Sequence, residues 1–346
     1  MTPAGRIDAH APAPNPLDPV DLLLLDELGD LPPGRIAVLD DAHGGLAAAL
    51  ADRTTSAVVA HSDSLVSERR LTDPAVEVVP DLASALVGAQ LVVLRLPKSL
   101  DALDEMARTA AQLGAEDVRL VAGGRTKHMT PSMNAVLAAS FEKVRASLGR
   151  QKSRVLHAGV AKKVKQEWPR QRHHDDLGLT VHAHGAVFAG TRVDAGTALL
   201  ISQLHQLTDT DGTVVDLGCG TGILAALLAR RFAHVTAIDV SAAAVASARL
   251  TTAGRVDVRR VDGLSECADA SIATVVSNPP FHVGTTKDST PTLDMIHDAG
   301  RVLLSGGELL MVFNAHLPYL PRLKHLGPTD ILARDKDYLV TRTIHD

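Results

Sequence analysis

The sequence predicts an α/β protein that contains two copies of one domain, each built around a mostly parallel sheet. The first observation is VVDLGCGTGILAALLA at 214–229, where a β-branched run, a glycine turn and an alanine- and leucine-rich helix follow one another. The second is IATVVSNPPF at 272–281, a strand that ends abruptly at two prolines. Both patterns recur in weaker form at 34–52 and 89–100. A repeat of this length indicates the duplication of a whole domain.

The remaining segments supply the other elements of the two domains. Residues 1–19, rich in Pro and Ala, are predicted to be disordered, and the polar residues 169–178 are predicted to be a linker. A strand near a sheet edge, guarded by lysines, is expected within 153–168, and two antiparallel strands are expected within 330–344. Further strands and helices are expected in 20–28, 56–64, 118–129, 179–204, 232–241, 255–263 and 283–319.

The glycine turn predicts the kind of ligand. Gly218, Gly220 and Gly222 allow positive φ and let a ligand approach the main chain closely. Their G-x-G-x-G spacing differs from the G-x-G-x-x-G of dinucleotide-binding proteins. Asp216 ends the strand, where its carboxylate would repel a pyrophosphate but attract a ligand with an ammonium and a sulfonium. S-adenosylmethionine carries these charges, and we predict it as the cofactor.

Two later strand ends carry acidic residues that suit a nucleotide. Asp239, followed by Val240, lies at about the distance from Asp216 at which an acidic residue holds ribose hydroxyls in nucleotide-binding α/β units. Asp262, followed by Gly263, ends the next strand and could accept a hydrogen bond from the adenine amine. A purely structural strand–helix turn would not require these residues in this order.

The two prolines predict the reacting centre. Pro279 and Pro280 have no N–H to donate to a neighbouring strand, so the strand ends there and presents Asn278 at the carboxyl edge of the sheet. We expect Asn278 to contact the cofactor as well as the substrate. An exocyclic amine on an aromatic ring is weakly nucleophilic because its lone pair is delocalised. We expect the Asn278 side-chain oxygen and the Pro279 carbonyl to accept its N–H bonds and direct the lone pair to the donor methyl. Phe281 would stack on the ring.

The composition limits the class of protein. The 346 residues suffice for two domains with separate cores, and the two cysteines, Cys219 and Cys267, have neither a disulfide pattern nor metal-ligand spacing. We therefore expect no metal. The sequence shows no signal peptide, and LLLL at 22–25 is too short to span a bilayer. We expect a cytoplasmic protein without a membrane partner and slightly favour a monomer.

The net charge of −5 conceals an uneven distribution. Residues 142–172 contain ten Lys or Arg against Glu142 and Glu167. A basic segment on an acidic protein favours phosphate binding at one face. A solvated strand and linker explain it equally well, so the sequence alone leaves contact between this segment and RNA open.

The first copy differs from the second where chemistry is expected. The alignment pairs Asp216, Gly218, Gly220 and Gly222 with Leu39, Asp41, His43 and Gly45, and it pairs NPPF with Leu96, Pro97, Lys98 and Ser99. The amide is lost, and β-carbons at two turn positions should block a cofactor. We predict that residues 20–168 form a degenerate domain that docks RNA or supports a catalytic domain at 179–346.

The order of these features resembles the bacterial ribosomal RNA guanine-N2 methyltransferases, which carry two tandem methyltransferase-like domains. The resemblance is carried by the degenerate half, the basic segment, VFAGTRVDAG, VVDLGCGTG, SNPPFH, GGELLMVFNAHLPY and KDYLVTR. It implies two class I, Rossmann-like domains with mostly parallel seven-stranded sheets that end in an antiparallel hairpin, the first domain being degenerate. It also implies a ribosomal RNA or ribosomal subunit as partner and an unpaired or flipped-out guanine as target.

The resemblance assigns roles residue by residue. The methionine part of the donor would contact Asp216, Gly218, Gly220 and Gly222, the ribose Asp239, and the adenine Asp262 and Gly263. Val240 is also expected to bind the cofactor, and the guanine would contact Asn278, Pro279 and Phe281.

Two other functions fit parts of the sequence. An NPP followed by an aromatic residue also serves planar amides, so a protein methyltransferase acting on a glutamine side-chain amide is one alternative. The duplicated domain and the basic segment argue against it. A non-catalytic RNA-binding or assembly factor is the other alternative, and the intact acidic and glycine positions of the second copy argue against that.

Overall fold

The computed structural model describes residues 17–279 and 290–346. The chain divides into two compact units: residues 1–62, 67–96 and 109–164 form the first, and residues 63–66, 97–108 and 165–346 form the second. The predicted disorder of residues 1–19 falls almost entirely outside the described residues, and helix α1 already begins at Pro19. Among the described residues, no helix combines the length and apolar character needed to cross a bilayer.

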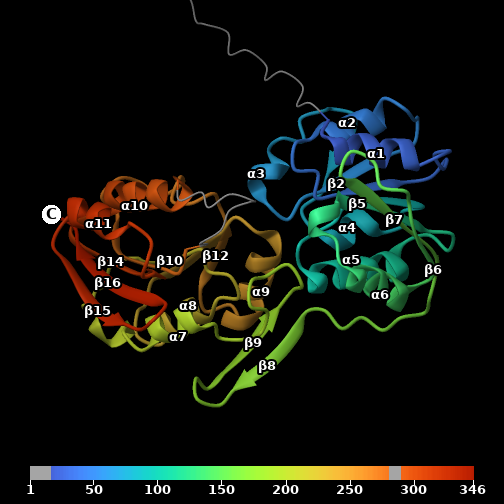
Figure 1. The fold of residues 1–346 in the computed structure, drawn as a ribbon. Coiled ribbons are helices and arrows are strands. Elements are labelled where there is room, and N and C mark those ends of the chain that lie inside the picture. Colours follow the sequence, from blue (N-terminus) through green and yellow to red (C-terminus); the bar gives the residue numbers. More distant parts are fainter. Residues whose placement is uncertain (1–16, 280–289) are drawn as a thin grey trace, which may run out of the picture. The chain divides into compact units, whose positions relative to one another are not determined.

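The sheet of the first unit has seven strands in the order β3-β2-β1-β4-β5-β7-β6 (Figure 1). Strands β1 to β5 pair in parallel, whereas β7 is antiparallel to both β5 and β6. The strands are β1 Ile36–Leu39, β2 Val58–His61, β3 Val76–Val78, β4 Leu91–Arg95, β5 Arg119–Arg125, β6 Phe141–Ala146 and β7 Ser153–Ala161. The helices are α1 Pro19–Glu27, α2 Gly45–Ala51, α4 Leu82–Leu86, η1 Thr126–His128 and α6 Pro131–Ser140, while α3 Leu65–Glu68 and α5 Leu100–Leu113 contain residues of both units.

The sheet of the second unit repeats this arrangement strand for strand, in the order β12-β11-β10-β13-β14-β16-β15 (Figure 1). Strands β10 to β14 pair in parallel, and β15 and β16 close the sheet as an antiparallel hairpin. The strands are β10 Val214–Leu217, β11 Val235–Asp239, β12 Asp257–Arg260, β13 Ile272–Ser277, β14 Leu303–Asn314, β15 Thr329–Arg334 and β16 Tyr338–Ile344. The helices are α7 Ala195–Ile201, η2 Leu204–Gln206, α8 Ile223–Leu228, α9 Ala242–Thr252, α10 Thr290–Val302 and α11 Leu320–Leu326. The predicted fold class and duplication are confirmed.

Helices cover both faces of the second sheet, which explains its uninterrupted apolar strands. Successive strand residues point to opposite faces, so Val214 joins one core and Val215 the other. The core around Val214 includes residues of α7, α8 and α9, and the core around Val215 includes residues of α10 and α11. A parallel sheet buried in this way reads as continuous hydrophobic runs rather than as an alternation.

Two local expectations differ from the structure. Where a linker was expected, β8 Arg170–His174 pairs antiparallel with β9 Leu179–Ala183. The residues of β8 are mostly exposed, so the strand lacks the apolar alternation that marks a half-buried strand. The strand expected near a sheet edge is β7, which lies one place inside the edge. The edge strand itself, β6, was not predicted, because most of its side chains are exposed.

Candidate active site

The carboxyl ends of β10 and β13 form the centre of the site. The two strands are parallel neighbours, with Leu217 opposite Ser277, and the Ser277 hydroxyl donates to the Leu217 carbonyl over 2.8 Å. Gly218 and Asn278, which follow these residues, therefore leave the sheet at the same edge. The chain order changes sides here, because β11 lies on one side of β10 and β13 on the other. Ligands of open α/β sheets bind at such a switch point.

The first two glycines of the turn face open space. Gly218 and Gly220 have φ values of +72° and +53°. Among the described residues, a β-carbon on Gly218 would meet nothing within 4 Å, and one on Gly220 would meet only Val187 Cγ1 at 4.0 Å. Gly222 differs, since a β-carbon there would lie 2.9 Å from Ala248 in α9. Gly222 thus has a packing reason of its own, and its predicted ligand contact stays a prediction.

Asp216 is fully buried beneath the turn. Its Oδ2 accepts from the Ala225 main-chain N–H at 2.9 Å, and its Oδ1 accepts no hydrogen bond from the described residues. Burial, with a smaller contribution from Asp239, raises the pKa of Asp216 to about 7 despite the hydrogen bond from Ala225. An orphaned carboxylate oxygen under an open glycine turn fits the ammonium end of S-adenosylmethionine.

We expect the ligand-free protein to lose stability relative to Asp216→Asn as pH rises from about 4 to about 7. The folded-state pKa lies above the unfolded value of 3.8, so between these pH values the folded state binds more protons and its stability falls as pH rises. The full penalty is on the order of 4 kcal/mol. Melting temperatures across this range measure the difference, and parallel curves for the two proteins would contradict the expectation.

The other nucleotide positions follow neighbouring strands of the same edge. Both oxygens of Asp239 accept main-chain hydrogen bonds, Oδ2 from Gly220 and Oδ1 from Ser241, each at 2.9 Å. Burial raises the pKa of Asp239 despite these hydrogen bonds. Asp262 is exposed two residues after β12, and a β-carbon on Gly263 would meet nothing within 4 Å. Their contacts with ribose and adenine, and that of Val240, stay predictions.

Asn278 is held by two residues of the α7 N-terminus. Its Nδ2 donates to Thr197 Oγ1 at 2.9 Å and, more distantly, to Asp194 Oδ1 at 3.5 Å. Its Oδ1 is buried and accepts no hydrogen bond from the described residues. Sequence analysis missed Thr197, although an Asp three residues before a Thr at a helix start is a capping pattern that could have indicated it. Phe281 lies outside the described residues.

The structure corrects the alignment of the two copies by one residue. Both β1 and β10 end in leucine, at Leu39 and Leu217, and left-handed Gly44 and Gly222 precede α2 and α8. The counterpart of Asp216 is therefore Val38 rather than Leu39. The positions equivalent to Gly218, Gly220 and Gly222 are Asp40, Ala42 and Gly44, instead of Asp41, His43 and Gly45. Asp40 shares the positive φ of Gly218, at +56°.

The ladder register corrects the proline turn in the same way. Leu39 pairs with Leu94, as Leu217 pairs with Ser277. The counterpart of Asn278 is therefore Arg95, not Leu96.

The turn of the first unit is filled by a side chain of its own. Asp41 is almost fully buried, and its Oδ1 accepts from the main-chain N–H groups of His43 and Gly44 at 3.1 and 2.9 Å. Its Oδ2 accepts from Ala47 at 2.9 Å, the position equivalent to Ala225. A carboxylate thus occupies the turn that Gly218 and Gly220 leave open in the second unit.

Comparisons with known proteins agree with this two-part architecture. A family described as methyltransferase small domain matches residues 178–342, and one described as RLMG N-terminal domain matches residues 13–162. The ribosomal RNA large subunit methyltransferase G of Streptomyces coelicolor is 31% identical over 335 residues, which cover 90% of this chain and 89% of that protein. The chain belongs to the ribosomal RNA large subunit methyltransferase G family. The same protein of Pectobacterium atrosepticum is 29% identical over 94% of this chain and 91% of its own length.

A solved structure shares the fold of this family member. A T. thermophilus 16S rRNA N2 methyltransferase, in complex with AdoMet and guanosine, matches with a TM-score of 0.79 and 23% identity. The match covers 95% of this chain and 92% of that chain. The tandem arrangement of two methyltransferase-like domains is therefore common to both proteins.

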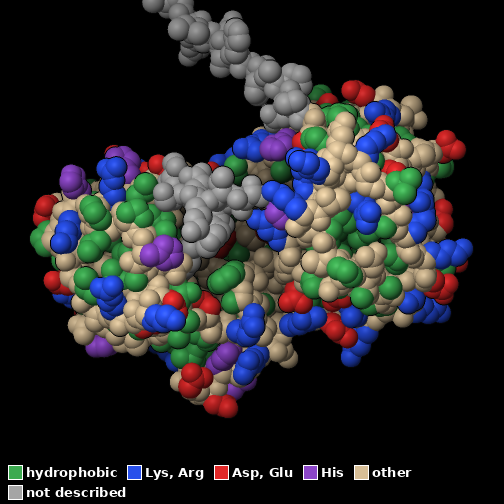
Figure 2. All heavy atoms as spheres, viewed as in Figure 1, with side chains coloured by type: hydrophobic (Ala, Val, Ile, Leu, Met, Phe, Trp, Pro, Cys, Tyr) green, Lys and Arg blue, Asp and Glu red, His purple; other side chains and the backbone are tan. Residues whose placement is uncertain are grey.

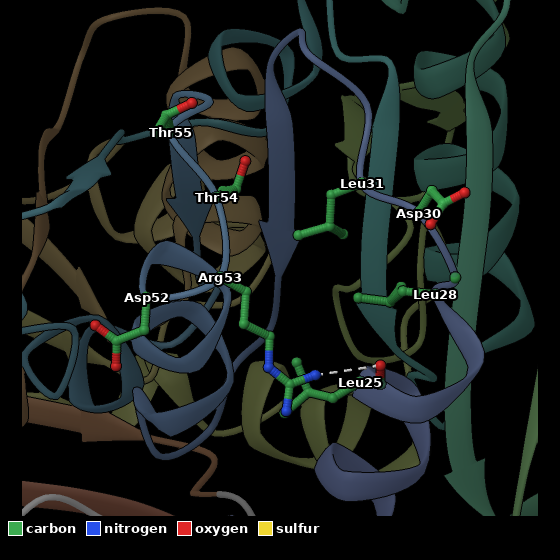
Figure 3. A pocket seen from close by; sticks show the side chains of 9 residues that line it. Leu25, Leu28, Asp30, Leu31, Asp52, Arg53, Thr54 and Thr55 are labelled. Carbon is green, nitrogen blue, oxygen red and sulfur yellow. Dashed lines mark hydrogen bonds between the residues drawn. The ribbon is translucent and has the colours of Figure 1, made fainter.

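A hollow of about 760 Å³ in the first unit lies away from the edge used for ligands in this fold (Figure 3). Its walls are the end of α1, the segment before β1 and the residues that follow α2. These residues precede β1 and β2, so the hollow is at the amino edge of the sheet. Inside it, Arg53 Nη1 donates to the Leu25 carbonyl over 3.4 Å (Figure 3). We assign it no role in the activity of the family.

We expect this family member to bind one S-adenosylmethionine per chain. The carboxylate of Asp41 accepts from turn N–H groups of the first unit, so of the two equivalent turns the one around Gly218 is open. Isothermal titration calorimetry at cofactor concentrations up to the millimolar range measures the stoichiometry. A second site that persists in Gly218→Ala would contradict this expectation.

Proposed function

We propose that the second unit transfers the methyl group of S-adenosylmethionine to the exocyclic N2 amine of a guanine in large-subunit ribosomal RNA. The observation that carries this proposal is the buried Oδ1 of Asn278, which has no hydrogen-bond partner in the described part of the chain and follows the strand next to the one that leads into the turn of Gly218. An orphaned buried acceptor is costly to maintain in a folded protein and points to a hydrogen-bond donor that arrives with a ligand. The name shared by the relatives supports ribosomal RNA of the large subunit as the substrate.

Residues around the glycine turn suit the donor. Gly218 and Gly220 allow the methionine part to approach the main chain, and the free oxygen of Asp216 suits its ammonium. Asp239 offers carboxylate lone pairs to the ribose hydroxyls, and Asp262 lies farther along the same edge for the adenine. When bound, S-adenosylmethionine supplies an activated methyl group on a sulfonium.

The acceptor side needs only oriented hydrogen-bond acceptors. Asn278 Oδ1 and the Pro279 carbonyl accept hydrogen bonds from the two N–H groups of the amine. These hydrogen bonds favour a pyramidal nitrogen with its lone pair directed at the methyl carbon. Phe281 would stack on the base face. A guanine inside a duplex cannot reach this edge, so the target is unpaired or flipped out.

The transfer balances without a further reactant. The nitrogen lone pair forms the new C–N bond as the C–S bond breaks, and S-adenosylhomocysteine leaves with the bonding electron pair. The alkylated nitrogen then releases one proton to water, because an amide oxygen and a main-chain carbonyl are too weakly basic to retain it.

The first unit offers exposed cations for RNA contact. Its edge hairpin of β6 and β7 carries exposed Lys143, Arg145, Lys152 and Arg154. In the view of Figure 2, Lys and Arg side chains are spread among Asp and Glu side chains rather than gathered into one basic face. We propose that the first unit docks RNA through such local contacts, and RNA binding that weakens steeply with added salt is the expected consequence.

The decisive experiment combines the protein, methyl-labelled S-adenosylmethionine and an unmodified transcript of large-subunit ribosomal RNA, with assembled subunits as a parallel substrate. We expect label on a single guanine, recovered as N2-methylguanosine after digestion. Label on ribosomal protein instead of RNA would favour the glutamine-amide alternative. No calorimetric heat with millimolar S-adenosylmethionine would favour a non-catalytic assembly factor.

A further inference from the structure

Two side chains at the start of α7 and one that follows β13 meet in one hydrogen-bonded chain. Asp194 caps α7, where its Oδ1 accepts from the Thr197 main-chain N–H at 3.1 Å. Its Oδ2 accepts from the Thr197 hydroxyl at 2.6 Å. The Thr197 oxygen in turn accepts from Asn278 Nδ2 at 2.9 Å. Thr197 is 8% exposed, so water competes little for these bonds.

The polarity of this chain fixes the orientation of the Asn278 carboxamide. A hydroxyl has one proton to donate, and a carboxylate has none. Once Thr197 donates to Asp194, its oxygen can only accept, and of the two ends of a carboxamide only the NH₂ group can donate. The NH₂ end of Asn278 must therefore face Thr197, which leaves Oδ1 as a buried acceptor to which no group within 17–279 and 290–346 donates.

Asp194, Thr197 and Asn278 form a triangle, since Asn278 Nδ2 also lies 3.5 Å from Asp194 Oδ1. The first unit has a triangle at the equivalent positions, with different chemistry. Asp18 caps α1 as Asp194 caps α7, and Asp21 occupies the third helical position as Thr197 does. Arg95 stands at the strand end equivalent to Asn278. Its Nη2 donates to Asp18 at 2.8 Å and its Nη1 donates to Asp21.

The two triangles differ in what they leave at the sheet edge. Arginine has no acceptor atom, so the position equivalent to Asn278 pairs with two carboxylates in the first unit and offers no oxygen of its own to an incoming N–H group. In the second unit, Thr197 has a hydroxyl where the first unit has the Asp21 carboxylate. This hydroxyl accepts from the Asn278 amide, whose oxygen has no hydrogen-bond partner among the described residues.

We propose that Thr197, held by Asp194, is a positioning residue that sets the acceptor specificity of Asn278, an inference that rests on the function proposed above. With Oδ1 presented, the site accepts a group that donates N–H, as the guanine amine does. A reversed amide would present an NH₂ group and would favour the guanine acceptors O6 or N7 instead. Thr197 thereby selects the amine without touching the substrate.

The test compares Thr197→Val, which keeps the shape but loses the hydroxyl, with Thr197→Ser, which keeps the hydroxyl. Methyl transfer to the ribosomal RNA transcript gives kcat, and calorimetry gives the Kd for S-adenosylmethionine. We expect kcat to fall at least about tenfold in Thr197→Val, with Kd within about twofold of wild type, because misorientation affects the reacting geometry rather than donor binding. Thr197→Ser should recover most of kcat. Wild-type kcat in Thr197→Val, or an equal loss of kcat and donor affinity in both variants, would overturn the inference.

Two further variants keep the test decisive. Asp194→Asn retains a good helix cap but replaces a carboxylate, which only accepts hydrogen bonds, by an amide that can also donate to Thr197. It should therefore lower kcat without weakening donor binding. This variant also tests the proposal if Thr197→Val does not fold. Asp21→Asn alters the matching triangle of the first unit, so it should lower the melting temperature and leave kcat unchanged. Absence of methyl transfer by the wild-type protein would count against the proposed function itself, whereas wild-type turnover in Thr197→Val and Asp194→Asn would overturn only the positioning role.

Discussion

Replacing Asn278 by alanine is expected to lower kcat for methyl transfer by about 10²- to 10³-fold, the effect typical of losing one preorganised hydrogen-bonding group at a reacting centre. The Kd for S-adenosylmethionine should change by no more than about threefold, because the amide acts mainly on the amine. The basis is the buried Oδ1 of Asn278, which has no partner among the described residues. Single-turnover kinetics with the RNA transcript and calorimetry with the donor measure the two quantities.

An asparagine in the first unit provides the control for this experiment. Asn134 is half-buried in α6, and its Nδ2 donates to the Pro131 carbonyl at 3.5 Å. Asn134→Ala should leave kcat and Kd unchanged. If Asn278→Ala loses donor affinity and turnover in equal measure, its role is in donor binding, and the assignment of its oxygen to the acceptor amine is wrong.

Replacing Gly218 by alanine is expected to weaken S-adenosylmethionine binding at least about 100-fold while the protein remains folded. The added β-carbon meets no atom of residues 17–279 or 290–346 within 4 Å, so it projects into the space assigned to the ligand. The positive φ of Gly218 makes alanine cost about 1–2 kcal/mol of stability, enough to lower the melting temperature by a few degrees. Calorimetry and thermal unfolding separate the two effects.

Two other glycines make the result specific. Gly254 also has a positive φ, of +75°, and open space around it, so Gly254→Ala should cost similar stability without any change in donor affinity. Gly222→Ala should destabilise the fold more, because its β-carbon would lie 2.9 Å from Ala248. Unchanged donor affinity in Gly218→Ala would remove the ligand from this turn.

Much of the fold could be predicted because its signals are local. The strand ending at Leu217 and the helix that follows Gly222 are specified by residues close to them in the chain, and the same holds for the closing hairpin. The alignment of the two copies was less secure. Gly44 and Gly45 are adjacent in sequence, and only the backbone shows that Gly44 is the left-handed residue before α2. Matching residue types alone paired Gly222 with Gly45 instead of Gly44, and this shifted the alignment of the whole glycine turn by one residue.

The sequence by itself determined that the glycine turn and the Asn-Pro turn lie at one edge of the sheet. The alternation of strand residues, the conformational freedom of glycine and the missing N–H of proline each act over a few neighbouring residues. Only the tertiary structure decided which side-chain oxygens at that edge accept no hydrogen bond from the described residues. Thr197 lies 81 residues before Asn278, yet it orients that amide. The direction of a hydrogen bond depends on which donors and acceptors the fold brings within about 3 Å, and sequence spacing does not report that distance.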